Sequence, residues 1–282
     1  MPDPYFISFE LIIYLQFALC LRHALRHGFP GLFKLGSGVL FGVLLELATI
    51  RQLNAYEYGR FLIMVLDVPL CIGMAWSCVI YSTMEFSDSS RLPYWLRPVL
   101  DGMLALNIDL ALDAAAIRLG FWDWGAGLQF QYFGVPYANF WAWFWVVFCF
   151  SLGYRIFARA GDWRGIWLPA PTALLLGLTG VLTTNALITS IVPESIRAET
   201  IGLTLSIALI TIFLNRSLLN QQKADPVAFW IPFLTHSYIL IAGLVSGVVL
   251  DPPFLLIVGL GMSMIAFFLH KDTVKKLFIN PE

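Results

Sequence analysis

Two aspartates within one apolar run are the residues best suited to catalysis. Residues 96–119 form a hydrophobic segment that contains Asp109 and Asp113, four positions apart. In a helix this spacing places both carboxyl groups on one face, about 6 Å apart. Two like charges in a low-dielectric environment favour protonation of one of them, and a carboxylic acid kept protonated is what general-acid chemistry requires. The alternative is a structural role, in which both side chains form hydrogen bonds to neighbouring helices or pair with an arginine.

A third carboxylate lies in another apolar run. Glu46 is flanked by Leu44, Leu45 and Leu47. An ionisable side chain inside a bilayer costs several kcal/mol unless it is paired or faces water, so it needs a partner. Glu46 is expected either to pair with Arg51 or Arg60 or to complete an acidic cluster with the aspartates.

Aromatic residues crowd the segment that follows the two aspartates. An interfacial aromatic belt explains some of them. Gly134 and Pro136 in addition predict a fixed turn, and a polar amide begins the next apolar run. Rings beside acids suit a long, flat, apolar substrate and a cationic intermediate, stabilised by ~0.5–2 kcal/mol per ring. The candidate binding residues in this segment are Trp122, Trp124, Tyr132, Phe133, Asn139 and Trp143.

The elements that position these residues are predicted to be membrane helices. Hydrophobic residues make up 59% of the 282 positions and charged residues 12%, against about 45–50% and about 25% in a soluble domain. We predict an all-α, polytopic integral membrane bundle of about nine transmembrane helices, forming one domain over residues 1–282. The weakest span is 199–215, short enough to be re-entrant. The spans are expected near residues 5–22, 35–50, 61–84, 96–119, 137–157, 166–191, 199–215, 228–249 and 254–270.

The distribution of basic residues predicts the orientation. With nine spans, 13 of the 17 Lys and Arg residues fall on one side and four on the other. The positive-inside rule then places the amino terminus outside and the carboxyl terminus in the cytoplasm of a cell-membrane protein. No basic segment precedes the first run and no small-residue cleavage site follows it, so we expect this run to remain in the mature protein.

Composition also argues against several kinds of site. The net charge is −1 and the charges are scattered, which predicts no nucleic-acid partner. The four cysteines form no CxxC pair and there are only four histidines, so we expect no metal centre and no redox cofactor.

The motifs together resemble the membrane carotenoid biosynthesis protein family, whose characterised members are carotenoid hydratases. An earlier stretch is similar too, so the specific similarity covers about residues 46–143. This sequence departs from the family in the turn at residues 48–54 and at Ala114, which stands where a proline often follows the second aspartate. The residues that carry the resemblance are Glu46, Tyr56-x-Tyr58, Val68-Pro69-Leu70, Trp76, Asp109-x3-Asp113, Gly120-Phe121-Trp122-Asp123-Trp124 and Tyr132-Phe133-Gly134-Val135-Pro136-x2-Asn139-Phe140-x2-Trp143.

The resemblance implies addition of water to the terminal double bond of a linear carotenoid, without a cofactor. One aspartate would donate the proton while the other, ionised, would stabilise the tertiary cation and orient water. Glu46 is a further catalytic candidate, and Tyr56, Tyr58 and Trp76 are further candidates for substrate binding. Tyr132 or Asn139 would hold the water, and an end-group pocket would be lined by Trp122, Trp124, Phe133 and Trp143. The partners expected are a long isoprenoid substrate, membrane lipids and other carotenoid-pathway enzymes.

Two other functions remain open at this point. Asn107-x-Asp109-x3-Asp113 resembles the aspartate-rich motif of membrane prenyltransferases. Those enzymes bind diphosphate through Mg²⁺ and need a second acidic motif, which this sequence does not contain. A lipid or carotenoid carrier, or a transporter that uses the carboxylates as a proton relay, is the alternative that involves no reaction.

Overall fold

Long helices account for the apolar runs of the sequence. The computed structural model describes residues 3–53, 55–219, 225–275 and 277. Nine helices of 16 residues or more lie in this described part, which confirms the all-α bundle. They are α1 (Pro4–Arg26), α2 (Gly28–Leu53), α3 (Leu70–Ser89), α4 (Arg97–Arg118), α5 (Tyr137–Phe157), α7 (Pro169–Ala186), α8 (Glu194–Leu214), α9 (Pro226–Ser246) and α10 (Phe254–Leu269).

Short elements connect these helices. Four two-residue strands form two antiparallel pairs, β1 with β4 and β2 with β3. The strands are β1 (Glu57–Tyr58), β2 (Met64–Val65), β3 (Val68–Pro69) and β4 (Trp122–Asp123). The short helical turns are η1 (Tyr94–Leu96), α6 (Trp163–Trp167), η2 (Leu187–Ile191), η3 (Arg216–Leu219) and α11 (Lys271–Val274).

Six helices of the described residues are long and apolar enough to cross a membrane. They are α1, α2, α5, α7 with its extension η2, α8 and α9. Helix α10 is apolar but has 16 residues. Helices α3 and α4 fall outside this set, and α4 carries Asp101, Asp109 and Asp113. Nine crossings and the orientation of the termini therefore stay predictions.

Two of the expected spans need correction. The span 61–84 is wrong over its first part, because β2 and β3 precede α3. Pro69 lacks an N–H and disfavours helical backbone at Val68, so the helix begins only at Leu70. The span 199–215 is longer than expected: α8 is a continuous helix of 21 residues. In the divergent turn, residues 48–53 continue α2, whereas Asn54 lies outside the described residues.

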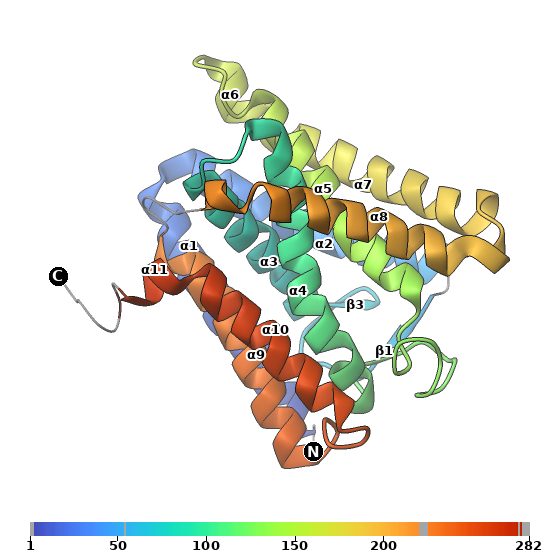
Figure 1. Ribbon diagram of the computed structural model, residues 1–282. Helices are drawn as coiled ribbons and strands as arrows, with labels where there is room; N and C mark the ends of the chain where they lie inside the picture. The colour runs from blue at the N-terminus through green and yellow to red at the C-terminus, as the bar shows by residue number, and fades with distance from the viewer. Residues whose placement is uncertain (1–2, 54, 220–224, 276, 278–282) are drawn as a thin grey trace.

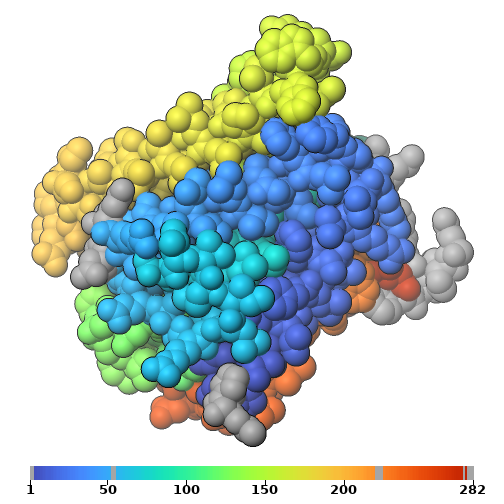
Figure 2. Space-filling view, turned by 180° about the vertical axis from the view of Figure 1, so that it is seen from behind, coloured from blue at the N-terminus to red at the C-terminus, as the bar shows by residue number. Residues whose placement is uncertain are grey.

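Helices α4 and α5 lie between two peripheral pairs of helices (Figure 1). Helices α9 and α10 pack together and against α4, while α7 packs along α5 and α8 crosses both α4 and α5. Helices α1, α2 and α3 pack together on the opposite side. Seen from behind, α1, α2 and the β2–β3 segment cover this face, and α6 and α7 run along its upper edge (Figure 2).

One end of the bundle is capped by loops. The β1–β4 pair joins the segment after α2 to the segment after α4, with Tyr58 opposite Trp122. The amide of Gly59 donates a hydrogen bond to the carbonyl of Phe121 at 2.9 Å, and Phe121 packs against Phe6 and Phe9 of α1. The carboxyl ends of α2 and α4 and the amino ends of α1, α3 and α5 therefore meet at this capped end.

Candidate active site

A cavity of about 430 Å³ lies beneath the loop cap. Side chains from α1, α2, α3, α4, α5, α7 and α9 line it, together with residues of both capping loops. Its walls are mainly apolar, with a few polar groups that face inward. A mostly apolar cavity with converging polar groups is the usual form of a small-molecule site.

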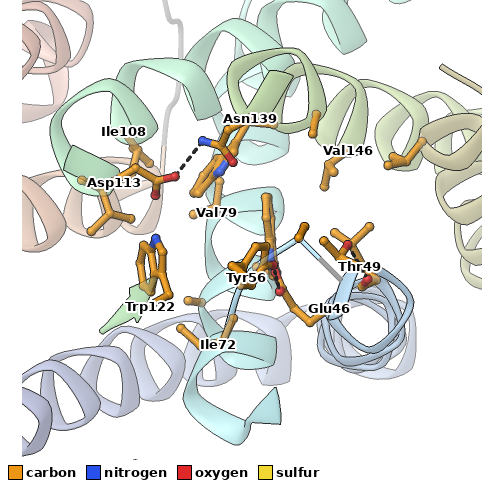
Figure 3. Close-up of a pocket in the computed structure, with 18 of the residues that line it drawn as sticks. Glu46, Thr49, Tyr56, Ile72, Val79, Ile108, Asp113, Trp122, Asn139 and Val146 are labelled. Carbon is orange, nitrogen blue, oxygen red and sulfur yellow. Dashed lines mark hydrogen bonds between the residues drawn. The ribbon is translucent and has the colours of Figure 1, made fainter. Parts of the chain in front are cut away.

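The two aspartates share one amide on the wall formed by α4 and α5. The side-chain nitrogen of Asn139 donates to Asp113 Oδ2 at 2.6 Å and to both oxygens of Asp109 at 3.2 Å. One amide nitrogen therefore joins the two carboxyl groups. Both are buried, and the amide–carboxyl contact is visible beside the cavity in Figure 3.

Glu46 lies on the facing wall and accepts three hydrogen bonds. Trp76 Nε1 donates to Oε1 at 2.6 Å, the Tyr58 hydroxyl donates to Oε2 at 2.7 Å, and the Tyr56 hydroxyl donates to the same oxygen. Figure 3 shows Glu46 and Tyr56 on one side of the cavity and Asp113 on the other.

The two tyrosines that bind Glu46 stay protonated. Burial and then the charge of Glu46 raise the pKa of Tyr56 and of Tyr58 well above the ordinary value of 10.0. Both phenols therefore act as donors at any physiological pH. Their backbone lies outside the membrane helices, in and beside β1, so the loop cap fixes the orientation of a carboxylate on α2.

Stacked rings complete the walls of the cavity. Trp76 and Trp143 lie with ring centroids 4.4 Å apart, and Tyr56 packs edge-on against Trp124 at 4.6 Å. The indole nitrogen of Trp124 has no hydrogen-bond partner among the described residues. Trp122 also lines the cavity, and Figure 3 shows its indole nitrogen pointing toward Asp113. The residues that line the cavity thus combine π faces with the unpartnered indole N–H of Trp124.

Nine of the twelve predicted site residues line this cavity. They are Glu46, Tyr56, Tyr58, Trp76, Asp113, Trp122, Trp124, Asn139 and Trp143. Asp109 does not line the cavity, but it accepts a hydrogen bond from Asn139, which does. Tyr132 and Phe133 lie elsewhere: the Tyr132 hydroxyl donates to the Leu110 carbonyl at 3.0 Å, and Phe133 packs against Phe254 of α10. The pocket and water-binding roles expected of Phe133 and Tyr132 find no support in this geometry.

Arg51 and Arg155 pair with other carboxylates. Arg51 binds Asp67 at 2.6 Å on the surface, so the expected pairing of Glu46 with Arg51 is wrong. On α4, Asp101 binds Arg155 of α5 at 3.1 Å and accepts a hydrogen bond from Ser151 at 2.5 Å. Asp101 therefore belongs to a buried ion pair between helices. No ion pair is found for Asp109 or Asp113 in the part of the chain that the structure describes.

Several polar residues at the site were not singled out from the sequence. Glu10 of α1 is fully buried and accepts hydrogen bonds from the backbone of Leu62 at 2.5 Å and from Tyr14 at 2.7 Å, which ties the loop cap to α1. Gln16 donates to Thr235 of α9 at 2.9 Å, and both line the cavity. For two of them a signal was available: Glu10 and Gln16 are each a single polar residue among apolar neighbours, whereas Thr235 is followed by His236 and Ser237.

The sequence model of a family described as carotenoid biosynthesis protein matches residues 39–212. The chain belongs to the carotenoid biosynthesis protein family. This match covers more than half of the chain, from α2 to α8, and it includes all twelve predicted site residues. No curated protein and no solved structure matches the chain.

Family membership gives the protein a role in carotenoid biosynthesis. It does not by itself say which reaction is catalysed. The matched segment supplies both acidic walls of the cavity, whereas Gln16 and Thr235, which lie outside it, close the cavity from α1 and α9. Among the described residues no group of three or more His, Cys, Asp or Glu side chains has the arrangement of a metal site.

Proposed function

We propose that this protein adds water to the terminal carbon–carbon double bond of a linear carotenoid. One observation carries the proposal: the Asp113–Asn139–Asp109 unit and the triply bonded Glu46 occupy facing walls of one apolar, ring-lined cavity. Protonating a trisubstituted alkene needs a desolvated acid, a surrounding that tolerates a tertiary cation, and a positioned water. These residue types supply each of the three.

In the proposed reaction Asp113 is the acid. Its carboxyl proton is transferred to the less substituted alkene carbon, so the π electrons form the new C–H bond and leave a tertiary cation. A water molecule attacks this cation and forms the C–O bond, and its surplus proton returns to the Asp113 carboxylate. Atoms and charge balance, because the net change is alkene plus water to tertiary alcohol. Asp109 shares the proton with Asp113 and keeps the acid in its protonated form between turnovers.

The remaining residues have supporting roles in this proposal. Glu46, used as an acceptor by three donors, supplies the negative charge that faces the cation. The rings of Trp76 and Trp143 offer π faces to the same centre. The attacking water is proposed to bind between Asp113 and the indole N–H of Trp122, which lies on the same side of the cavity (Figure 3).

Expression in a lycopene-producing bacterium tests the proposal. Extracted pigments should gain the mass of one water molecule for each reacted end, and growth in H₂¹⁸O should place the heavy oxygen in the new hydroxyl group. Unchanged pigments in cells that contain the folded protein in their membranes would contradict hydration. A product of higher carbon number would instead indicate a prenyl-chain transferase.

A further inference from the structure

The cavity is closed toward α1 and α9. Gln16 and Thr235 line it at that end and hydrogen-bond to each other at 2.9 Å, and both are buried. The loop cap covers the end near β1. A bound molecule therefore has no exit along α1 or α9 without breaking this contact.

The opposite side of the cavity reaches the protein surface. Leu182 and Thr189, on the carboxyl-terminal half of α7 and in η2, line the cavity and are exposed, Leu182 to 36%. Thr49 of α2 lines the cavity across from them and is half-buried. The cavity thus opens between the ends of α2 and α7.

Helices α2 and α7 are in close contact before they reach the cavity. At Gly177 of α7 the Phe41 ring of α2 lies 2.7 Å from the point where a Cβ atom would be. One turn further along α7, Val181 and Leu182 line the cavity. Figure 2 shows α7 running beside α2 on this face of the molecule.

The mouth of the cavity lies on an apolar helix that is largely exposed. Only 17% of the apolar window of α7 and η2 is buried inside the protein, and this is one of the helices long and apolar enough to cross a membrane. With α7 in a membrane, an apolar molecule in the hydrocarbon layer has direct access to the mouth. The cavity volume of about 430 Å³ lies toward the lower end of the roughly 300–1,000 Å³ that encloses a drug-sized ligand. A carotenoid contains eight isoprene units, so only one end and a short piece of its chain fit inside.

We propose that the opening between α2 and α7 is a lateral portal, through which the substrate enters from the side of the bundle. The hydrocarbon chain of the substrate remains bound in this portal while its end reacts at Asp113. The inference rests on the proposed function for the identity of the reacting end. Leu182 is the rim residue that contacts the chain. It selects for a substrate whose chain carries no ring at the point where it passes the rim.

Narrowing the rim should discriminate substrates by length. With Leu182→Trp, hydration of lycopene should fall at least about tenfold, because its chain must occupy the portal throughout the reaction. A short linear isoprenoid with the same terminal alkene passes the portal only transiently, so its hydration should change less than about twofold. Leu175→Trp is the matched control: it lies on the same helix, is 64% exposed and does not line the cavity. Equal losses for both substrates, or none, would overturn the portal.

A binding measurement tests the portal without turnover. The four native cysteines are buried, so Leu182→Cys adds the accessible thiol. A membrane-permeant maleimide should label this thiol more slowly when lycopene is present, whereas Leu175→Cys should label at an unchanged rate. Equal labelling of Leu182→Cys with and without lycopene would refute the portal. If lycopene slows the labelling of Leu182→Cys but the protein hydrates no carotenoid, the portal stands and only the proposed reaction is refuted.

Discussion

At the scale of single residues, the two aspartates that the sequence treats alike differ in what they face. Asp113 lines the cavity, whereas Asp109 does not line it and hydrogen-bonds to Asn139, which does. The four-residue spacing predicts a shared helix face, but it does not predict which aspartate reaches the cavity.

The proposed acid can be tested by isosteric replacement. Asp113→Asn should reduce hydration by ~10²–10⁴-fold, the usual contribution of a general acid, because an amide cannot donate a proton to an alkene. Asp109→Asn should cause a smaller loss, since Asp113 keeps its access to the substrate. Product formation per amount of membrane-inserted protein is the measurement.

Asp101→Asn is the control for a buried aspartate on the same helix. It weakens the ion pair with Arg155, so it should lower the unfolding temperature in detergent while product formation per folded protein is retained. An Asp113→Asn protein as active as the wild type would remove Asp113 from the reaction.

At the scale of elements, the loop cap holds the Glu46 carboxylate in place. Glu46 belongs to α2, but two of its three donors come from the segment at β1. Gly59 follows this strand where the chain passes close to α1 and to the segment after α4: an added Cβ would lie 2.5 Å from the Phe6 ring and 2.6 Å from the Gly120 carbonyl. Even one methyl group there requires the cap to move.

Gly59→Ala should therefore reduce product formation while the helix bundle stays folded. A shift of the cap by about 1 Å can cost on the order of 10²-fold in rate, because Tyr56 and Tyr58 would no longer orient Glu46. Helix content by circular dichroism should be unchanged. Gly202→Ala on α8, where an added Cβ meets no atom within 4 Å, should leave product formation as it is. Full activity of Gly59→Ala would show that the cap does not position Glu46.

At the scale of the whole molecule, most elements of the site lie at one end of the bundle. The carboxyl-terminal halves of α2, α4 and α7 and the amino-terminal halves of α1, α3 and α5 line the cavity, and the amino terminus starts at the same end. With the predicted orientation, the proposed reaction would take place in the outer half of the membrane.

Reporter fusions test this orientation. A fluorescent protein fused to the carboxyl terminus should fluoresce in a bacterial host, and a phosphatase fused there should be inactive, because that end is predicted to be cytoplasmic with 13 of 17 basic residues on its side. An active phosphatase at the carboxyl terminus would reverse the orientation and move the site to the inner half. It would leave the cavity itself unaffected.

Local patterns determined much of this protein. The apolar runs predicted nine long helices, since burying backbone groups in lipid requires internally bonded helices, and the family motifs named nine residues that line one cavity. The boundary at residues 61–69 was predicted wrongly, because hydropathy alone does not reveal that Val68-Pro69 pairs as a strand.

Only the tertiary structure decided which polar residues meet. In the folded protein Glu46 accepts hydrogen bonds from two tyrosines and a tryptophan, and Arg155 forms an ion pair with Asp101. Gln16, Leu182 and Thr235 line one cavity although their helices are far apart in the chain. The physical reason is that spacing within a helix fixes which side chains share a face. The rotation and neighbours of each helix depend instead on packing against the others, which no local pattern encodes.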